Sequence, residues 1–170
     1  MKRKSILIVI SARDFNETEF LTVKRELGKN GYDVFAASDS HGLCSGDRGL
    51  KTKADIHFYN INPNNFEALI IIGGKGILNY IGDEILLRII DKFHTGNKIT
   101  ASICAAGLLL AKAGVLKGFP ATCYPDLKSE LEKEGAEYID APVVVHKNII
   151  TAQNPAAAQE FVQAVLNRLK

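Results

Sequence analysis

The stretch KITASICAAGLLLAKAGVLKG, residues 98–118, decides the fold of this 170-residue chain. Its first six residues favour a β-strand, and a helical pattern begins directly after the single cysteine Cys104. In open α/β sheets, functional groups gather beyond the carboxyl ends of the strands, and a side chain at a sharp strand-to-helix bend projects from that edge. The stretch therefore predicts a strand, a tight turn at Cys104 and a helix, and it marks the turn as a candidate site.

The same alternation of strand and helix patterns continues through the rest of the chain. Strands are expected at residues 5–11, 32–38, 67–74, 98–103 and 120–125, with a late strand or hairpin at 141–153. Helices are expected at residues 17–31, 83–98, 105–118, 126–136 (capped by Asp126) and 155–170, and a loop or short hairpin at 39–49. The order predicts an α/β fold with three layers: a doubly wound, mostly parallel sheet with helices on both faces, in one domain over residues 1–170.

Composition and charge narrow the classes of partner. The chain has 21 Lys and Arg against 19 Asp and Glu, a net charge of +2, which gives no reason to expect nucleic-acid binding. No apolar run approaches the roughly 20 residues that a membrane span requires. The apolar run at residues 5–11 is too short for the core of a signal peptide. We therefore expect a cytoplasmic protein that binds neither nucleic acid nor membrane.

The three cysteines, Cys44, Cys104 and Cys123, form no CxxC pair and have no zinc-like spacing with histidine. A disulfide framework is not expected, and no cluster of residues calls for a metal or an organic cofactor. Cys104 has two readings of equal weight. The partial positive charge of a helix start favours a reactive thiolate, whereas free cysteines are also among the most deeply buried residues, as inert parts of a core.

Two further strand ends carry groups that could serve a cysteine nucleophile. IIIGGKG, residues 70–76, ends a buried strand in glycines, which let backbone N–H groups face a pocket; the pattern by itself favours a plain tight turn. RDFNETEF, residues 13–20, places acidic side chains at a helix start. We expect Glu19 to lie at the edge of the buried face, where a neighbouring thiolate would keep its carboxyl protonated, and Glu17 to face water.

Taken together, the three strand ends resemble those of the ThiJ/PfpI superfamily, which includes the Parkinson's-associated protein deglycase and the PfpI intracellular proteases. The resemblance is collinear over nearly the whole chain and includes SILIVISARDFNETEF, FEALIIIGG, ASICAAG and NIITAQNPAAAQEFVQAVL. It implies a flavodoxin-like, class I glutamine amidotransferase-like sheet. It also implies a homodimer or higher homo-oligomer, with the site near a subunit boundary.

The resemblance implies roles for individual residues as well. Cys104 would be the elbow nucleophile and Glu19 the acid that touches its sulfur, while the N–H groups of Gly74 and Ala105 would bind an oxyanion. PfpI-type proteases carry a histidine directly after the cysteine, where this chain has Ala105, and the deglycase branch carries one where this chain has Tyr124. The auxiliary candidates are Tyr124, Gly73, Glu17 and His41.

These features lead us to expect a ThiJ/PfpI-type stress protein whose Cys104 thiolate attacks a small reactive aldehyde, or the early adduct of one on a glycated protein or a nucleotide. It would then be a cysteine-dependent hydrolase or a glyoxalase-like lyase. One alternative is an oxidative-stress sensor or chaperone without turnover, whose cysteine is oxidised to a sulfinate. Another is an intracellular cysteine protease or amidase, which the missing histidine disfavours because an amine leaving group requires a general acid.

Overall fold

The computed structural model describes residues 3–170, so the first two residues of the expected domain range lie outside it. The strands are β1 (Ser5–Val9), β2 (Arg13–Phe15), β3 (Asp33–Ser38), β4 (Leu43–Gly46), β5 (Lys51–Lys53), β6 (Ile56–His57), β7 (Ala68–Ile71), β8 (Ile99–Ile103), β9 (Pro120–Ala121), β10 (Glu137–Tyr138), β11 (Val143–His146) and β12 (Ile149–Ala152). The α-helices are α1 (Glu17–Lys29), α2 (Glu84–Thr95), α3 (Gly107–Lys112), α4 (Lys128–Lys133) and α5 (Ala158–Leu169).

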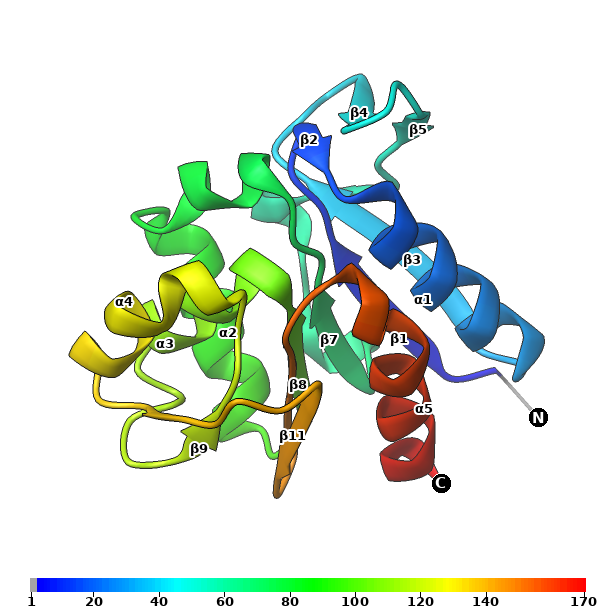
Figure 1. Cartoon of the computed structure of the whole chain (residues 1–170). Coiled ribbons are helices and arrows are strands. Elements are labelled where there is room, and N and C mark those ends of the chain that lie inside the picture. Colours follow the sequence, from blue (N-terminus) through cyan, green and yellow to red (C-terminus); the bar gives the residue numbers. More distant parts are fainter. Residues whose placement is uncertain (1–2) are drawn as a thin grey trace.

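A seven-stranded sheet forms the middle layer, in the order β11-β12-β8-β7-β1-β3-β6. Its pairs are parallel except for the antiparallel pair of β11 and β12. Helices α1 and α5 lie side by side over one face, and α2 and α3 cover the other (Figure 1). The predicted three-layer, mostly parallel architecture is therefore confirmed. Because β1, β7 and β8 are neighbours, the three chemically unusual strand ends meet at one edge of the sheet.

Apolar periodicity and capping side chains explain the helices that frame this edge. In α1, Phe20, Val23 and Leu27 are buried, and the Asn16 side chain caps the first turn by accepting from the N–H of Glu19 at 3.0 Å. In α2, Asp83 accepts from two N–H groups of the first turn. Both helices thus begin at a side-chain cap, and α1 begins directly beside the edge where the strand ends meet.

Some local expectations were wrong. Asp126 does not cap α4: it lies in a preceding 3₁₀ turn, and the residue before α4 is Leu127, which makes no side-chain cap bond. The strand expected at residues 120–125 is limited to β9, which pairs with β10 apart from the main sheet. The expectation of a loop or short hairpin at residues 39–49 is confirmed, because this segment contains β4, which forms a hairpin with β5 and also pairs with β2 in a separate three-stranded sheet.

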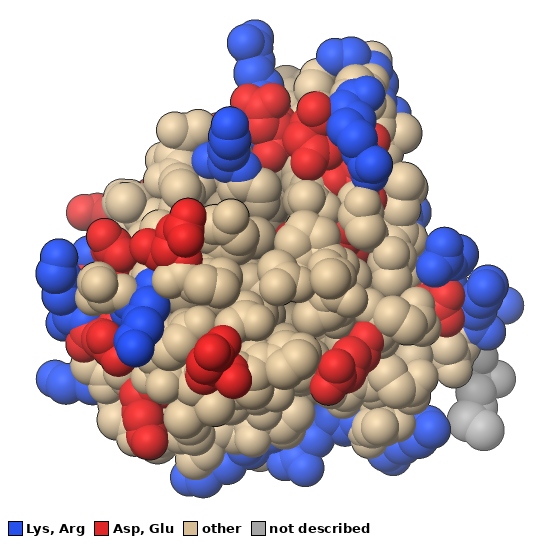
Figure 2. All heavy atoms as spheres, in the orientation of Figure 1, with Lys and Arg blue, Asp and Glu red and all other residues tan. Residues whose placement is uncertain are grey.

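Charged side chains of both signs are distributed over the surface. On the face drawn in Figure 2, Lys and Arg are interspersed with Asp and Glu around a centre of mostly uncharged side chains. Across residues 3–170, no helix combines the length and the apolar character that a bilayer crossing demands.

Candidate active site

Cys104 occupies a strained turn between β8 and the helical segment that follows it. Its φ angle is +60°, in the left-handed region that costs a non-glycine residue about 1–2 kcal/mol. β8 is buried throughout, and a 3₁₀ turn, η4 (Cys104–Ala106), leads directly into α3. The sharp bend expected from the sequence is present, and it brings the sulfur to the carboxyl edge of the sheet.

A glycine allows a second segment to pack against this turn. A Cβ on Gly107 would lie 2.7 Å from the Cβ of Cys123, closer than side chains approach one another, so residues 121–124 can lie here only because residue 107 is glycine. The backbone N–H of Tyr124 then donates to the carbonyl oxygen of Cys104 at 3.2 Å. This hydrogen bond fixes Tyr124 beside the cysteine.

Glu19 lies in the first turn of α1 and is completely buried. Its Oε2 accepts a hydrogen bond from the N–H of Gly73 at 2.7 Å, whereas its Oε1 has no hydrogen-bond partner among the described residues. Burial raises the pKa of Glu19 to about 8; the Gly73 N–H and the neighbouring Cys104 side chain oppose the shift, and the charge of Asp47 adds to it. The carboxyl is therefore neutral at pH 7 and has a proton to donate beside the sulfur.

The Cys104 thiol lies in the same electrostatic environment. Burial raises its pKa to about 12, an ionised Glu19 would raise it further, and the N–H groups of Ala105 and Gly74 lower it. Burial thus opposes the thiolate that a helix start favours, and in the resting pair at pH 7 both protons are in place. The two groups influence each other strongly, so the first proton lost as the pH rises belongs to the pair and not to either residue alone.

The glycines that follow β7 allow three segments to approach each other. A Cβ on Gly73 would lie 2.7 Å from the Cβ of Cys104 and 2.9 Å from Oε2 of Glu19. Gly74 has φ +107° and ψ 167°, a conformation essentially restricted to glycine, and a Cβ there would lie 2.6 Å from the backbone nitrogen of Asn16. The tight-turn reading of these glycines is therefore correct in steric terms, and the turn also brings the N–H of Gly74 to the sulfur.

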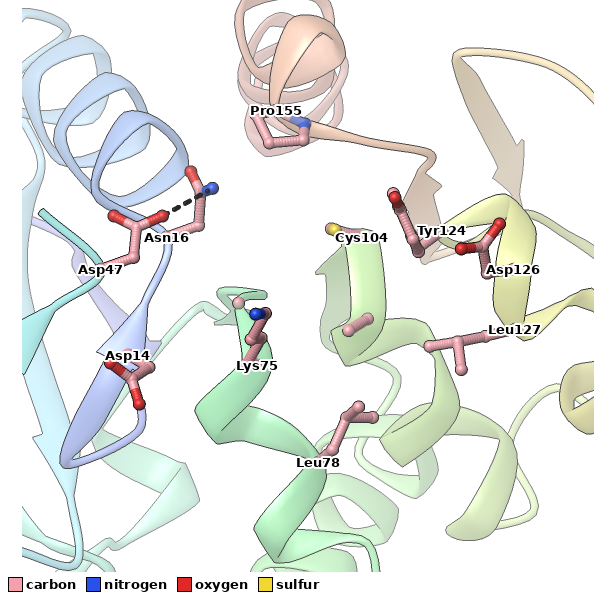
Figure 3. Close-up of a pocket in the computed structure, with 12 residues that line it drawn as sticks. Asp14, Asn16, Asp47, Lys75, Leu78, Cys104, Tyr124, Asp126, Leu127 and Pro155 are labelled. Carbon is pink, nitrogen blue, oxygen red and sulfur yellow. Dashed lines mark hydrogen bonds between the residues drawn. The ribbon is translucent and has the colours of Figure 1, made fainter.

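The Cys104 sulfur faces a cavity of about 600 Å³. One wall comes from the small β2-β4-β5 sheet and the start of α1, and it presents Asp14, Asn16 and Asp47 (Figure 3). Gly74 and Ala105 lie in the floor beside Cys104.

The other walls come from three separate segments. Tyr124, Asp126 and Leu127 stand opposite Asp14 and Asp47, Lys75 and Leu78 project from the 3₁₀ segment η3 (Lys75–Tyr80), and Pro155 closes the side toward α5 (Figure 3). The cavity therefore combines apolar side chains with a few charged groups, as is common in sites for small molecules.

Asn16, Asp47 and Lys75 are cavity residues that the sequence patterns did not single out. The backbone N–H of Asn16 donates to the carbonyl oxygen of Gly73 at 3.0 Å, and its side-chain amide donates to Asp47 at 3.3 Å. The spacing of Asn16 and Glu19 is that of a capped helix start, which could have identified Asn16. No local signal identifies Asp47, because it reaches the cavity through the β4–β5 turn.

The expectation that Glu17 faces water was wrong. Glu17 is 8% exposed, and its Oε1 accepts from the N–H groups of Arg48 at 2.8 Å and of Leu50 at 2.7 Å. In return, the side chain of Asp47 accepts from the N–H of Glu17 at 3.2 Å. Glu17 therefore binds the β4–β5 turn to the start of α1 and has no place among the residues that line the cavity.

The four histidines all lie within residues 3–170, and none of them lines the cavity. His41, the auxiliary candidate, stacks on His57 with ring centroids 4.5 Å apart, and the His57 ring bonds to the backbone oxygen of Asp39. His146 stacks on Phe119. The structure thus brings Cys104, Glu19, Gly73, Gly74, Ala105 and Tyr124 together and leaves His41 and Glu17 apart from them.

No group of three or more His, Cys, Asp or Glu side chains in the described part of the chain is arranged to hold a metal ion. The chemistry that the site can supply on its own is that of a thiol, a neutral carboxyl, two backbone N–H groups and a tyrosine hydroxyl.

Comparison with known proteins gives a consistent result. The model of the DJ-1/PfpI family matches residues 4–168. An uncharacterized protein of Methanocaldococcus jannaschii is 36% identical over 173 residues, which cover 100% of this chain and 84% of that protein. A deglycase of Pyrococcus horikoshii is 31% identical over 164 residues, which cover 96% of this chain and 99% of the deglycase.

Among solved structures, a ThiJ/PfpI domain protein from Brachyspira murdochii superimposes with a TM-score of 0.96. The two chains are 28% identical, and the superposition covers 99% of this chain and 98% of the other. The similarity thus extends over the whole α/β architecture, including all three strand ends at the site.

Proposed function

This chain belongs to the DJ-1/PfpI family, and from that membership we propose that it uses the Cys104 thiol to convert reactive aldehydes, either free or as early adducts on proteins. The names of related deglycases support glycated substrates. The observation that carries the proposal is the contact between Cys104 and a buried, neutral Glu19 whose Oε1 has no partner among the described residues. A neutral acid beside a thiol at the floor of a cavity suits proton transfer during addition to a carbonyl.

The reaction begins with addition of the thiol to an α-oxoaldehyde. The Cys104 sulfur bonds to the aldehyde carbon and gives up its proton to water, while the aldehyde oxygen takes the proton of Glu19. This gives a hemithioacetal and leaves Glu19 as a carboxylate. The N–H groups of Gly74 and Ala105 lie beside the sulfur and stabilise the charge that develops on that oxygen. With an adduct on a side-chain amine, attack at the carbinol carbon breaks its C–N bond and forms the same hemithioacetal, and the leaving amine takes the proton of Glu19.

Glu19 then moves a proton between two carbons of the substrate. As a carboxylate it removes the proton from the former aldehyde carbon, and as an acid it returns a proton to the adjacent carbonyl carbon. The first carbon is thereby oxidised and the second reduced, with no external oxidant. One water hydrolyses the resulting thioester and restores the thiol. One methylglyoxal and one water thus give one lactate and a proton.

Lactate formation from methylglyoxal tests this proposal. The wild-type chain should turn over, and Cys104→Ser should be inactive because a hydroxyl is a far weaker nucleophile at neutral pH. Cys44→Ala is the matched control, because Cys44 lies on β4 and does not line the cavity. Equal rates for wild type and Cys104→Ser would reject the proposal.

A second candidate function is oxidative sensing, and the surroundings of Cys104 support it. The unpartnered Oε1 of Glu19 and the N–H groups of Gly74 and Ala105 could hydrogen-bond a sulfinate. Two molecules of peroxide oxidise the thiol to a sulfinic acid and are reduced to two molecules of water. Intact mass after mild peroxide should show two added oxygens, located at Cys104 by peptide mapping; oxidation spread over all three cysteines, or none, would argue against a sensor.

Proteolysis is the weakest of the three candidates. Within residues 3–170, no histidine lines the cavity to serve as a general base or acid. Cleavage of a fluorogenic peptide by the wild-type chain, with loss of cleavage in Cys104→Ala, would nevertheless revive the protease hypothesis.

A further inference from the structure

We propose that the cavity around Cys104 selects the carrier of an aldehyde adduct by charge, admitting cationic and neutral carriers and excluding polyanionic ones such as nucleotides. Selection by charge follows from the charged side chains that line the cavity, whatever reaction takes place there. Only the identity of the carrier rests on the proposed function.

Acidic side chains outnumber basic ones in the cavity. Within the described part of the chain, Asp14, Asp47 and Asp126 line it, against the single cation Lys75. Neither Asp14 nor Asp126 has a hydrogen-bond or ion-pair partner for its carboxylate among residues 3–170. Asp47 differs, because Asn16 and the N–H of Glu17 occupy its oxygens, and the partly exposed Arg48 lies 3.9 Å away. Asp14 and Asp126 therefore carry the uncompensated charge.

The two uncompensated carboxylates lie on opposite walls. Figure 3 shows Asp14 on one side of Cys104 and Asp126 on the other, with the sulfur between them. Both carboxylates therefore contribute to the electrostatic potential that a ligand in the cavity experiences. The neighbouring Leu78, Leu127 and Pro155 are apolar, and walls of low polarity weaken the screening of nearby charges.

The fully buried Glu19 adjoins the cysteine without itself lining the cavity. Its carboxyl neighbours the Cys104 side chain, so its charge acts on the same point that a ligand must reach. When neutral, Glu19 adds no charge, and when ionised it adds a further negative charge. The electrostatic potential in the cavity is therefore negative whether Glu19 is protonated or ionised.

The cavity is large enough that the charge of the carrier, and not only the aldehyde, affects binding. About 600 Å³ lies within the range of sites that hold drug-sized ligands, far more than a three-carbon aldehyde occupies. The cavity therefore has room for part of the carrier to which the aldehyde is attached. The early adduct of an arginine side chain keeps its positive guanidinium, whereas the phosphates of a nucleotide would face Asp14 and Asp126.

The rate at which charged thiol reagents modify Cys104 tests the proposal without any turnover. Cationic trimethylammonioethyl and anionic sulfonatoethyl methanethiosulfonate each form a mixed disulfide with the cysteine and release methanesulfinate. Their rate ratio is normalised to that of a small neutral thiol. Cys104→Ser controls for reaction at Cys44 and Cys123, which are both fully buried.

We expect the normalised ratio to favour the cationic reagent by about tenfold at low salt and to fall as salt is added. Asp14→Asn and Asp126→Asn should each lower the ratio by about two- to threefold, and Lys75→Gln should raise it by a similar factor. Asparagine tolerates the left-handed φ of +59° at residue 14. Asp91→Asn on α2 changes the net charge equally outside the cavity and should leave the ratio unchanged.

A normalised ratio of one or below in the wild-type chain would overturn the proposal. So would a ratio that Asp14→Asn and Asp126→Asn leave unchanged, or that Asp91→Asn lowers to the same extent. The identity of the carrier is then tested by kcat/KM for methylglyoxal adducts of N-acetylarginine and of guanosine monophosphate, with the arginine adduct expected to be favoured at least about tenfold. Absence of all turnover would reject the proposed function but leave the reagent ratio as a valid measure of charge selection.

Discussion

Glu19 and Cys104 enclose residue 73 so closely that no side chain fits between them. A Cβ on Gly73 would lie 2.9 Å from Oε2 of Glu19 and 2.7 Å from the Cβ of Cys104. The acid comes from α1, the thiol from the turn after β8, and the glycine from the turn after β7. Three segments that are distant in sequence therefore approach one another so closely that residue 73 has to be glycine.

Gly73→Ala should displace the acid or the thiol. The added methyl group meets both side chains at less than 3.0 Å, so we expect a loss of about 1–3 kcal/mol in the free energy of unfolding, together with slower alkylation of Cys104. Gly82→Ala is the matched control, because a Cβ there would meet nothing within 4 Å. Chemical denaturation and alkylation kinetics on both variants check the prediction, which an alkylation rate equal to that of wild type would contradict.

Glu19→Gln should change how stability depends on pH. The pKa of Glu19 is raised from 4.5 to about 8 in the folded chain, so the stability that the protonated acid retains is fully present at low pH and is lost as pH rises through 8. Between pH 5 and pH 9 we expect wild type to lose about 2–4 kcal/mol more of its unfolding free energy than Glu19→Gln loses. Urea denaturation at several pH values measures the shift, and parallel profiles for the two proteins would refute a raised pKa.

Cys104→Gly should stabilise the chain relative to Cys104→Ala. The φ of +60° is strained for alanine and relaxed for glycine. Glycine also makes the unfolded chain more flexible, which offsets part of this advantage, so we expect the glycine variant to be more stable by about 0.5–1 kcal/mol. Lys147 has φ +54° in the β11–β12 hairpin, so Lys147→Gly compared with Lys147→Ala provides the same test outside the cavity. Thermal melts give the comparison; if the glycine variant at 104 melts below the alanine variant, the turn is not under strain.

Tyr124→Phe should lower the turnover of methylglyoxal without affecting folding. The side chain is 39% exposed and lines the cavity beside Cys104, so loss of the hydroxyl should change stability by no more than about 0.5 kcal/mol. Loss of a hydrogen-bond donor to the developing oxyanion should reduce kcat by about tenfold. Tyr124→His, which can also donate a hydrogen bond, should retain more activity than Tyr124→Phe, and equal kcat for Tyr124→Phe and wild type would exclude the hydroxyl from the reaction.

Much of the fold was predictable because its signals are local. The apolar runs of β1, β7 and β8 are buried on both sides, and a parallel sheet with helices on both faces requires such strands. The bend at Cys104 was predictable as well, because strand and helix patterns meet there without a linker. The hairpin around residue 147 follows from its alternating flanks and is confirmed by the pairing of β11 with β12.

The remainder of the site depends on contacts that no local pattern records. Glu17 was expected in water because it stands at a helix start, where acids are common. Its burial results from the β4–β5 turn, which folds back from residues 46–50 and donates two N–H groups to it. The same turn brings Asp47 to the cavity, so one contact that no local pattern signals explains both the wrong expectation for Glu17 and the absence of any expectation for Asp47.

The small β2-β4-β5 sheet contributes Asp14 and Asp47 to the cavity but no strand to the seven-stranded sheet that bears the thiol. The thiol and two of the acidic side chains that line the cavity therefore lie on separate sheets, and hydrogen bonds of Glu17 and Asp47 hold the small sheet to the start of α1. Substitutions in the β4–β5 hairpin can therefore alter the charge of one wall of the cavity without disturbing the strands that hold Cys104 in place.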